Sequence, residues 1–291
     1  MRGESPYNLR MLFDQITIVG VGLIGGSIGL AARVRGVAGR VIGVDRDPEA
    51  INNAMAVAAL DDYCMDLAEG VAGSGLVVVC TPVDRIAEVI VAAARHVKPG
   101  TLFTDAGSTK AAIVAAVRGN LPPGVEYVPA HPIAGSEKSG SEFSNADLFV
   151  NRATAVVMSP FGANWERTLA VGRFWEALGS RVVLMNADEH DRVLAFTSHL
   201  PHAVASAVAG VTQSDWLRIT GGGFRDVTRV AAGDPELWGA IFEANRDATL
   251  SALDAFTHRL QEFRALLETG DRAGVVRWLT EGKQVRDALG T

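Results

Sequence analysis

One histidine stands out as a residue that could carry chemistry, because of the segment in which it occurs. His131 lies in VPAHPIAGSEKSG, after a short extended stretch and before a polar loop that contains Ser136 and Glu137. A neutral imidazole can take a proton from an alcohol while a hydride leaves the same carbon. We therefore treat His131 as a candidate general base, although a lone histidine is more often structural than catalytic.

Three glycines in VGVGLIGGS form a second candidate site, with G-x-G-x-x-G spacing. Gly20 permits a tight turn, Gly22 lets the backbone approach a pyrophosphate, and Gly25 lets a helix pack closely on a strand. The helix that begins near Leu23 and Ile24 offers free amides and a positive dipole end to phosphates. The alternatives are a glycine-rich turn without a ligand and a site for a methyl-donor nucleotide.

An acidic residue supports the dinucleotide interpretation of this loop. Asp45 ends the second expected strand, where its carboxylate can accept hydrogen bonds from ribose hydroxyls. The carboxylate favours NAD because it repels a 2′-phosphate, whereas the neighbouring Arg46 could bind that phosphate. The sequence therefore predicts an NAD site and leaves NADP open.

Two further strand ends carry residues that could face a ligand. CTPVD places Thr81 and Pro82 at the crevice where open sheets bind nucleotides, although an ordinary strand end has the same composition. TDAGSTK places Asp105 and Ser108 beside the expected nicotinamide. The alternative role for this segment is helix capping by Ser108 or Thr109, which is compatible with a hydroxyl in an active site.

The C-terminal part adds two clusters of polar residues. TSHLPHAVA has His199 and His202 on one expected helix face, without a carboxylate at metal-binding spacing, so we predict no metal. In GGGFRDVTRVAAGDPELW, glycines that include Gly222 suggest a bend that presents Arg229. An arginine can hold a carboxylate through two parallel hydrogen bonds, whereas surface arginines on a helix are the alternative.

The segments between these motifs predict the elements that position them. Apolar runs such as LVVVC alternate with helical segments, which favours a parallel sheet covered on both faces, an α/β Rossmann-type doubly wound fold. This alternation continues to RVVLMN and then stops, so we expect an all-helical second part. The domains that we predict are an N-terminal lead-in at 1–13, a dinucleotide-binding domain at 14–187 and a helical domain at 188–291.

Composition argues against several classes of protein. The net charge of −6 is unlike that of a general nucleic-acid binder, which has a basic surface. The sequence has no apolar run of membrane-spanning length and no signal-peptide pattern. The two cysteines, Cys64 and Cys80, form no metal-binding pattern. We therefore expect a soluble cytoplasmic protein with no membrane or nucleic-acid partner.

Taken together, the motifs resemble the prephenate/arogenate (cyclohexadienyl) dehydrogenase family of tyrosine biosynthesis. The resemblance rests on GVGLIGGS, TDAGSTK, HPIAGSEKSG, SHLPHAVA and GGGFRDVTRVAAGDPELW, and it extends over about 15–285. It implies NAD-dependent oxidative decarboxylation of prephenate, arogenate or both, by a homodimer that forms through the C-terminal helices. This chain departs from the family at Arg225, where the family often has lysine.

The resemblance also implies a role for individual residues. His131 matches the catalytic base, Ser108 matches a catalytic serine near the nicotinamide, and Arg229 matches the residue that holds the ring carboxylate. The other positions implied to bind substrate are His199, His202, Ser136, Glu137, Gly222 and Trp238. The positions expected to bind the cofactor are Gly20, Gly22, Leu23, Ile24, Gly25, Asp45, Arg46, Thr81, Pro82 and Asp105.

Three rival functions share part of this pattern. A dehydrogenase of arogenate alone, or of amino-substituted prephenate in a secondary pathway, differs only in the substrate side chain or ring substituent. Another two-domain reductase, acting on hydroxyacids or imines, is not expected to carry HPIAG and SHLPH together. An NAD-binding protein without activity would produce no NADH with any ring substrate.

Overall fold

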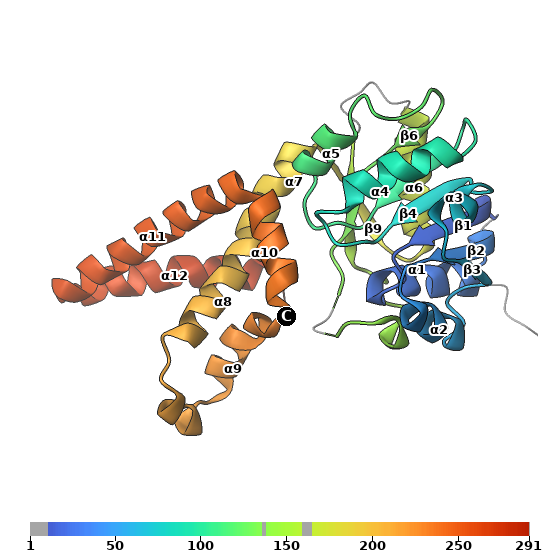
Figure 1. Cartoon of the computed structure of the whole chain (residues 1–291). Coiled ribbons are helices and arrows are strands. Elements are labelled where there is room, and N and C mark those ends of the chain that lie inside the picture. Colours follow the sequence, from blue (N-terminus) through green and yellow to red (C-terminus); the bar gives the residue numbers. More distant parts are fainter. Residues whose placement is uncertain (1–10, 136–137, 159–164, 291) are drawn as a thin grey trace, which may run out of the picture.

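The computed structural model describes residues 11–135, 138–158 and 165–290. Figure 1 shows two parts: a sheet flanked by helices, and a group of helices that extends away from it. Helices α5 and α7 lie where the two parts meet (Figure 1). The architecture confirms the predicted Rossmann-type sheet followed by a helical region.

Six parallel strands form the main sheet, in the order β3-β2-β1-β4-β5-β6. The strands are β1 Phe13–Val19, β2 Ala38–Val44, β3 Asp62–Cys64, β4 Leu76–Val79, β5 Leu102–Asp105 and β6 Glu126–Tyr127. The helices that connect them are α1 Leu23–Val34, α2 Pro48–Ala56, α3 Leu67–Val71, α4 Ile86–Ala93 and α5 Ala111–Val117. The strand order reverses between β1 and β4, which is where such sheets bind dinucleotides.

The apolar runs of the central strands are explained by burial on both faces of the sheet. Along β4, Leu76 and Val78 belong to one hydrophobic cluster, whereas Val77 and Val79 belong to the other. Successive side chains of a strand point to opposite faces, so a strand covered by helices on both sides needs apolar residues at every position.

A second, three-stranded sheet differs from the expectation of one continuous parallel sheet. It contains β7 Ala130–Pro132, β8 Ala153–Val157 and β9 Arg181–Met185, and β7 runs antiparallel to β8. Val128 makes the last backbone hydrogen bond to β5, at Phe103, and the following Pro129 has no amide hydrogen to continue the ladder. The chain therefore leaves the main sheet immediately before the residues that carry the candidate base.

After β9 the described chain contains helices and turns, without a further strand. The α-helices are α6 Trp165–Ala177, which precedes β9, and then α7 Ala187–Leu194, α8 Leu200–Gly210, α9 Gly222–Thr228, α10 Pro235–Ala244, α11 Arg246–Glu268 and α12 Arg272–Ala288. A π-helical turn, Ala195–His199, joins α7 to α8. In the described part of the chain, none of the helices combines the length and apolar character that crossing a bilayer requires.

Candidate active site

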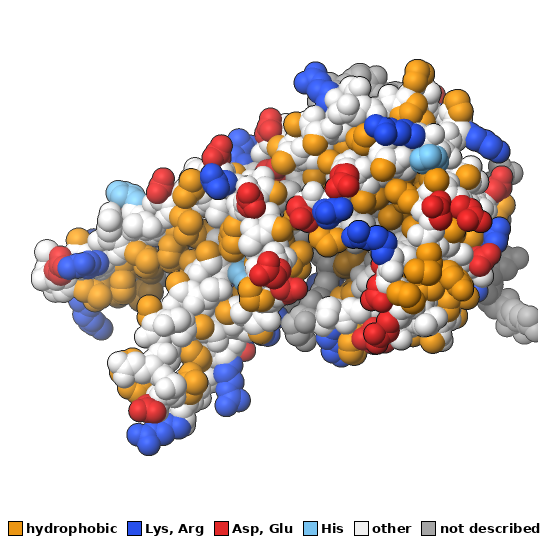
Figure 2. All heavy atoms as spheres, viewed as in Figure 1, with side chains coloured by type: hydrophobic (Ala, Val, Ile, Leu, Met, Phe, Trp, Pro, Cys, Tyr) orange, Lys and Arg blue, Asp and Glu red, His pale blue; other side chains and the backbone are white. Residues whose placement is uncertain are grey.

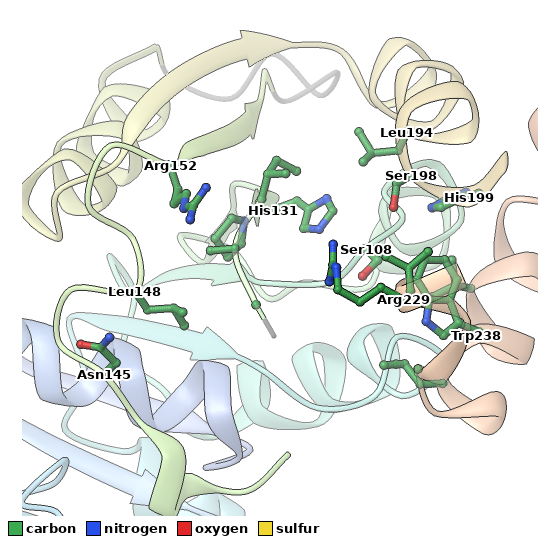
Figure 3. A pocket seen from close by; sticks show the side chains of 18 of the residues that line it. Ser108, His131, Asn145, Leu148, Arg152, Leu194, Ser198, His199, Arg229 and Trp238 are labelled. Atoms are coloured by element: carbon green, nitrogen blue, oxygen red, sulfur yellow. The ribbon is translucent and has the colours of Figure 1, made fainter. Parts of the chain in front are cut away.

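A cavity of about 790 Å³ lies between the two parts of the molecule and brings together residues from both. Ser108, which follows β5, and His131, in β7, line it from the sheet side (Figure 3). His199, Arg229 and Trp238 line it from the helical side (Figure 3). These five predicted site residues are far apart in the sequence, and the fold places them around one space.

His131 is held by a chain of hydrogen bonds that ends at a carboxylate. Its Nδ1 lies 2.9 Å from Nε2 of His190, and Nδ1 of His190 lies 2.8 Å from Oδ1 of Asp191. Because an ionised carboxylate only accepts, His190 donates from Nδ1 and accepts at Nε2. His131 must then donate from Nδ1, which leaves the lone pair on its Nε2 available as a base.

The surroundings of His131 keep its imidazole neutral. Burial is the main cause that lowers the pKa of His131 well below its usual value. The positive charge of Lys110, and of His190 and His199 when they are protonated, lowers it further. A largely desolvated ring near cationic groups resists protonation, so His131 is in the basic form at pH 7. The fold thus supplies both the tautomer and the charge state that a general base needs.

Asp191, at the end of the hydrogen-bond chain from His131, also caps α5. Its Oδ1 accepts from the amide of Lys110 and its Oδ2 accepts from the amide of Ala111, each at 2.8 Å. A carboxylate is favourable at a helix N-terminus because the free amides carry partial positive charge. The alternative role of Ser108 or Thr109 as a helix cap is therefore not seen, since α5 has no side-chain cap from its own segment.

Asp105 does not line the cavity, and the structure does not support its predicted contact with the cofactor. Its side chain is fully buried and accepts from the Lys110 ammonium, which is buried as deeply. It also accepts from the Gly107 amide at 2.9 Å, the Tyr127 hydroxyl at 2.8 Å and the Ala130 amide at 3.1 Å. A carboxylate with four internal donors has a structural role, and this one joins the end of β5 to β7.

The two histidines of the SHLPH segment have different surroundings. His199 lines the cavity, and its Nδ1 lies 3.1 Å from Nδ2 of Asn245. His202 is buried outside the cavity lining and stacks on Trp238, with ring centroids 3.6 Å apart. His202 supports the cavity wall that Trp238 forms, and its direct contact with substrate stays a prediction.

The remaining predicted substrate positions are placed as follows. Arg229 is exposed to the cavity and points towards Ser108 and His131 (Figure 3). Its guanidinium has no hydrogen-bond or ion-pair partner within the described residues. Gly222 begins α9 and is exposed but does not line the cavity, so the structure does not support its contact with substrate. Ser136 and Glu137 lie outside the described residues.

Several residues at this site have no sequence pattern that singles them out. Ser198 and Arg152 line the cavity with polar side chains, and His190 and Asp191 stand behind His131. Ser198 directly precedes a predicted site histidine, which is the signal that could have identified it. The histidine and aspartate at 190–191 are adjacent in the sequence, but their relation to His131 depends on how α7 packs.

The glycine loop has the backbone geometry that the sequence predicts. Gly20 has a φ of +92°, and a Cβ at this residue would lie 2.8 Å from the backbone of Cys80. A Cβ at Gly25 would lie 2.0 Å from the carbonyl oxygen of Gly20, so close packing of α1 requires glycine. A Cβ at Gly22 would meet nothing within 4 Å, which leaves space for a ligand, and α1 has no side-chain N-cap.

Other residues near this loop also fit a dinucleotide. Asp45 accepts from the Val21 amide at 2.9 Å, so its carboxylate is fixed beside the glycine loop. The Thr81 hydroxyl is buried without a hydrogen-bond partner in the described chain, which leaves it available to a ligand. Arg46 and Pro82, which directly follow Asp45 and Thr81 in the sequence, are exposed. A loop with open space, free helix amides and an ordered carboxylate matches what a nucleotide pyrophosphate and ribose need.

Comparisons with known proteins agree with this architecture. Residues 28–184 match the family model for the prephenate dehydrogenase nucleotide-binding domain, and residues 186–281 match that for the prephenate dehydrogenase dimerization domain. The cyclohexadienyl dehydrogenase of Zymomonas mobilis is 33% identical over 288 residues, which cover 96% of this chain and 97% of the relative. The prephenate dehydrogenase of Bacillus subtilis is 31% identical, with 97% and 77% covered.

Among solved structures, a prephenate dehydrogenase from Aquifex aeolicus in complex with hydroxyphenyl propionate and NAD⁺ superimposes with a TM-score of 0.89. It is 30% identical, and the match covers 97% of this chain and 100% of that one. The arogenate dehydrogenase from Synechocystis has a TM-score of 0.80 and 27% identity, with 94% and 99% covered. These matches confirm the resemblance found in the sequence: the chain belongs to the prephenate dehydrogenase family of oxidoreductases.

Proposed function

We propose that this protein catalyses the NAD-dependent oxidative decarboxylation of prephenate, arogenate or both, in tyrosine biosynthesis. The observation that carries the proposal is the placement of His131 as a neutral base in one cavity with Arg229, a cation without a partner in the described chain. The substrate carries a ring alcohol, which suits the base His131, and a ring carboxylate, which suits the cation Arg229.

The main contributions that the reaction needs from the protein are a general base and a cation that orients the substrate. Hydride leaves the ring carbon that bears the hydroxyl, CO₂ leaves across the ring, and the ring becomes aromatic. When bound, NAD⁺ supplies the hydride acceptor. His131 takes the hydroxyl proton at Nε2 and returns it to the phenolate oxygen, so the proton balance is zero. We assign to Ser108, which lines the same cavity, a hydrogen bond to the reacting oxygen.

Arg229 has the role of binding the substrate carboxylate. Its guanidinium offers paired donors in a fixed plane, which suits a carboxylate. The carboxylate loses its charge as CO₂ leaves, so an interaction that stabilised it strongly in the ground state alone would slow this step. We therefore assign Arg229 to substrate binding and orientation.

Replacing Arg229 by alanine is expected to raise KM by about 10- to 100-fold and to change kcat much less. The factor corresponds to a charged hydrogen-bonded contact of about 1.5–3 kcal/mol. Steady-state kinetics of NADH formation measure both constants. Arg229→Lys is the matched control, because it keeps the charge without the paired donors. Its KM should lie between that of the wild type and that of Arg229→Ala. A collapse of kcat at unchanged KM contradicts the assignment.

The glycine loop, the N-terminus of α1, Asp45, Thr81 and Pro82 are the proposed NAD site. The fixed carboxylate of Asp45 favours NAD, whereas the exposed Arg46 beside it is the feature that favours NADP. The decisive experiment measures reduced cofactor spectroscopically with prephenate and with arogenate, each with NAD and with NADP. Formation of NADH with either substrate supports the function, and no reduced cofactor in any of the four assays overturns it.

The proposed assembly is a homodimer that forms through the helical part. Figure 2 shows hydrophobic side chains along α11 and α12, and the exposed ones include Leu260, Leu267, Val276, Leu279 and Val285. Apolar residues on one projecting helix pair are typical of a surface that another chain covers. The match to a dimerization domain over 186–281 supports a dimer formed by the helical part and the proposed division of the chain near residue 187. The unpaired Cys64 and Cys80 fit the proposed cytoplasmic location.

A further inference from the structure

One side chain of the helical part determines which nitrogen of His199 carries the proton. Nδ2 of Asn245 lies 2.8 Å from the backbone oxygen of Asp191 and 3.1 Å from Nδ1 of His199. A backbone oxygen can only accept, so the amide nitrogen of Asn245 must face it, and the amide orientation is fixed. The second amide hydrogen then points to Nδ1 of His199, which must accept.

It follows that the other ring nitrogen is the donor. When Nδ1 accepts, the neutral imidazole carries its hydrogen on Nε2. Nε2 of His199 is buried and has no hydrogen-bond partner within the described residues, although the ring lines the cavity. A buried donor without a partner is unfavourable, and a ligand in the cavity would satisfy it.

His199 is also kept uncharged by its surroundings. The residue is 1% exposed, and burial lowers the pKa of His199 to about 4. Among the charged and titratable groups near it, Asp191 raises this pKa and His190 lowers it. The rings of Trp238 and Phe242 pack edge-on against the imidazole, so two of its neighbours are apolar.

We propose that Asn245 is a positioning residue that fixes His199 as a neutral donor, whose Nε2–H binds an oxygen of the substrate. This inference rests on the proposed function. A donor that cannot accept is compatible with a carboxylate, keto or hydroxyl oxygen. It is incompatible with an ammonium group at the same place, so His199 distinguishes substrates by the group that faces it.

The first test reads the tautomer directly and needs no activity. In protein with ¹⁵N-labelled histidine, the ring nitrogens of His199 are assigned by comparison with His199→Gln. We expect a protonated Nε2 and an unprotonated Nδ1 at pH 7, without titration between about pH 5.5 and 8. A protonated Nδ1, or a charged ring at pH 7, overturns the proposal.

The second test uses a double-mutant cycle in the assay of NADH formation. His199→Leu removes the donor and should raise KM about tenfold or more, whereas His199→Gln keeps an amide donor and should restore most of the affinity. Asn245→Leu should raise KM in the wild-type background but not in the His199→Leu background, because the asparagine acts through the histidine. Additive effects of the two substitutions contradict the positioning role.

Controls separate this inference from the proposed function. Asn120→Leu removes an exposed asparagine that does not line the cavity, and its KM should equal that of the wild type. If the wild type forms no NADH with any substrate, the proposed function fails. The tautomer measurement still decides whether Asn245 fixes His199 as a donor. If Asn245→Leu does not fold, as judged by circular dichroism, the tautomer of the wild type remains the deciding result.

Discussion

Replacing His131 by asparagine is expected to lower kcat/KM for NADH formation by about 10²- to 10⁴-fold, the usual contribution of a positioned general base. The hydrogen-bond chain from Asp191 through His190 leaves the Nε2 lone pair of His131 free for the substrate. An asparagine amide has no comparable basicity, so the hydroxyl proton must go to water. The substitution removes the base and leaves the cavity wall in place.

The pH dependence follows from the charge state of the same ring. The neutral form is active, so kcat/KM falls when the pH is low enough to protonate His131. Because burial lowers the pKa of His131 well below its usual value, the loss should occur at a pH clearly below 6.5 rather than near it. Measurement of kcat/KM from pH 4.5 to 8 should show a plateau through neutral pH and a fall in acid, and the fall due to His131 should be absent from the low activity of His131→Asn.

His190 provides a matched pair of variants for the hydrogen-bond chain. His190→Gln keeps an amide oxygen that can accept from Nδ1 of His131, whereas His190→Leu cannot accept. We expect the leucine variant to lose about 10²-fold in kcat/KM, because the tautomer of His131 is no longer fixed, and the glutamine variant to lose much less. Equal activities of the two variants would contradict the role of His190 in fixing the tautomer, whereas an unchanged rate in His131→Asn would mean that another group accepts the proton.

The parts of the site that the sequence predicts well are those in which single residue types meet local backbone demands. Gly20 needs a positive φ and Gly25 needs close packing, and both requirements arise within a few residues. The parallel strands β5 and β6 are neighbours that end at one edge, and Ser108 and His131 follow them, which is why these two residues could be expected together. These inferences need the order of the elements and not their detailed packing.

Other parts of the site depend on packing that the sequence does not reveal. His190 meets His131 across 59 residues because α7 lies against β7, and no local pattern encodes that contact. A polar residue at or after a strand end has the same appearance whether it lines a cavity, as Ser108 does, or contacts a buried lysine, as Asp105 does. His199 and His202 both contact Trp238 and Phe242, as their spacing on one helix face suggests, but only His199 lines the cavity, which the spacing does not reveal.

The buried pair of Lys110 and Asp105 is expected to have the largest effect on stability. Replacing Lys110 by methionine leaves the Asp105 carboxylate fully buried without its cation, which should cost about 3–5 kcal/mol of the free energy of unfolding. A loss of this size is a large part of the stability of a typical protein and should lower Tm on the order of 10 °C. Thermal unfolding followed by circular dichroism measures it.

A second substitution shows whether the unpaired charge or the lost packing causes the loss of stability in Lys110→Met. In Lys110→Met/Asp105→Asn the buried charge is gone, while an amide oxygen can still accept from Tyr127 and Ala130, so much of the lost Tm should return. If the double variant is no more stable than Lys110→Met, packing by the lysine stem explains the loss instead. Activity should follow the same order, because Asp105 joins the strand end before Ser108 to the residue before His131. The ion pair thus acts on catalysis through the position of both groups, without contact with the substrate.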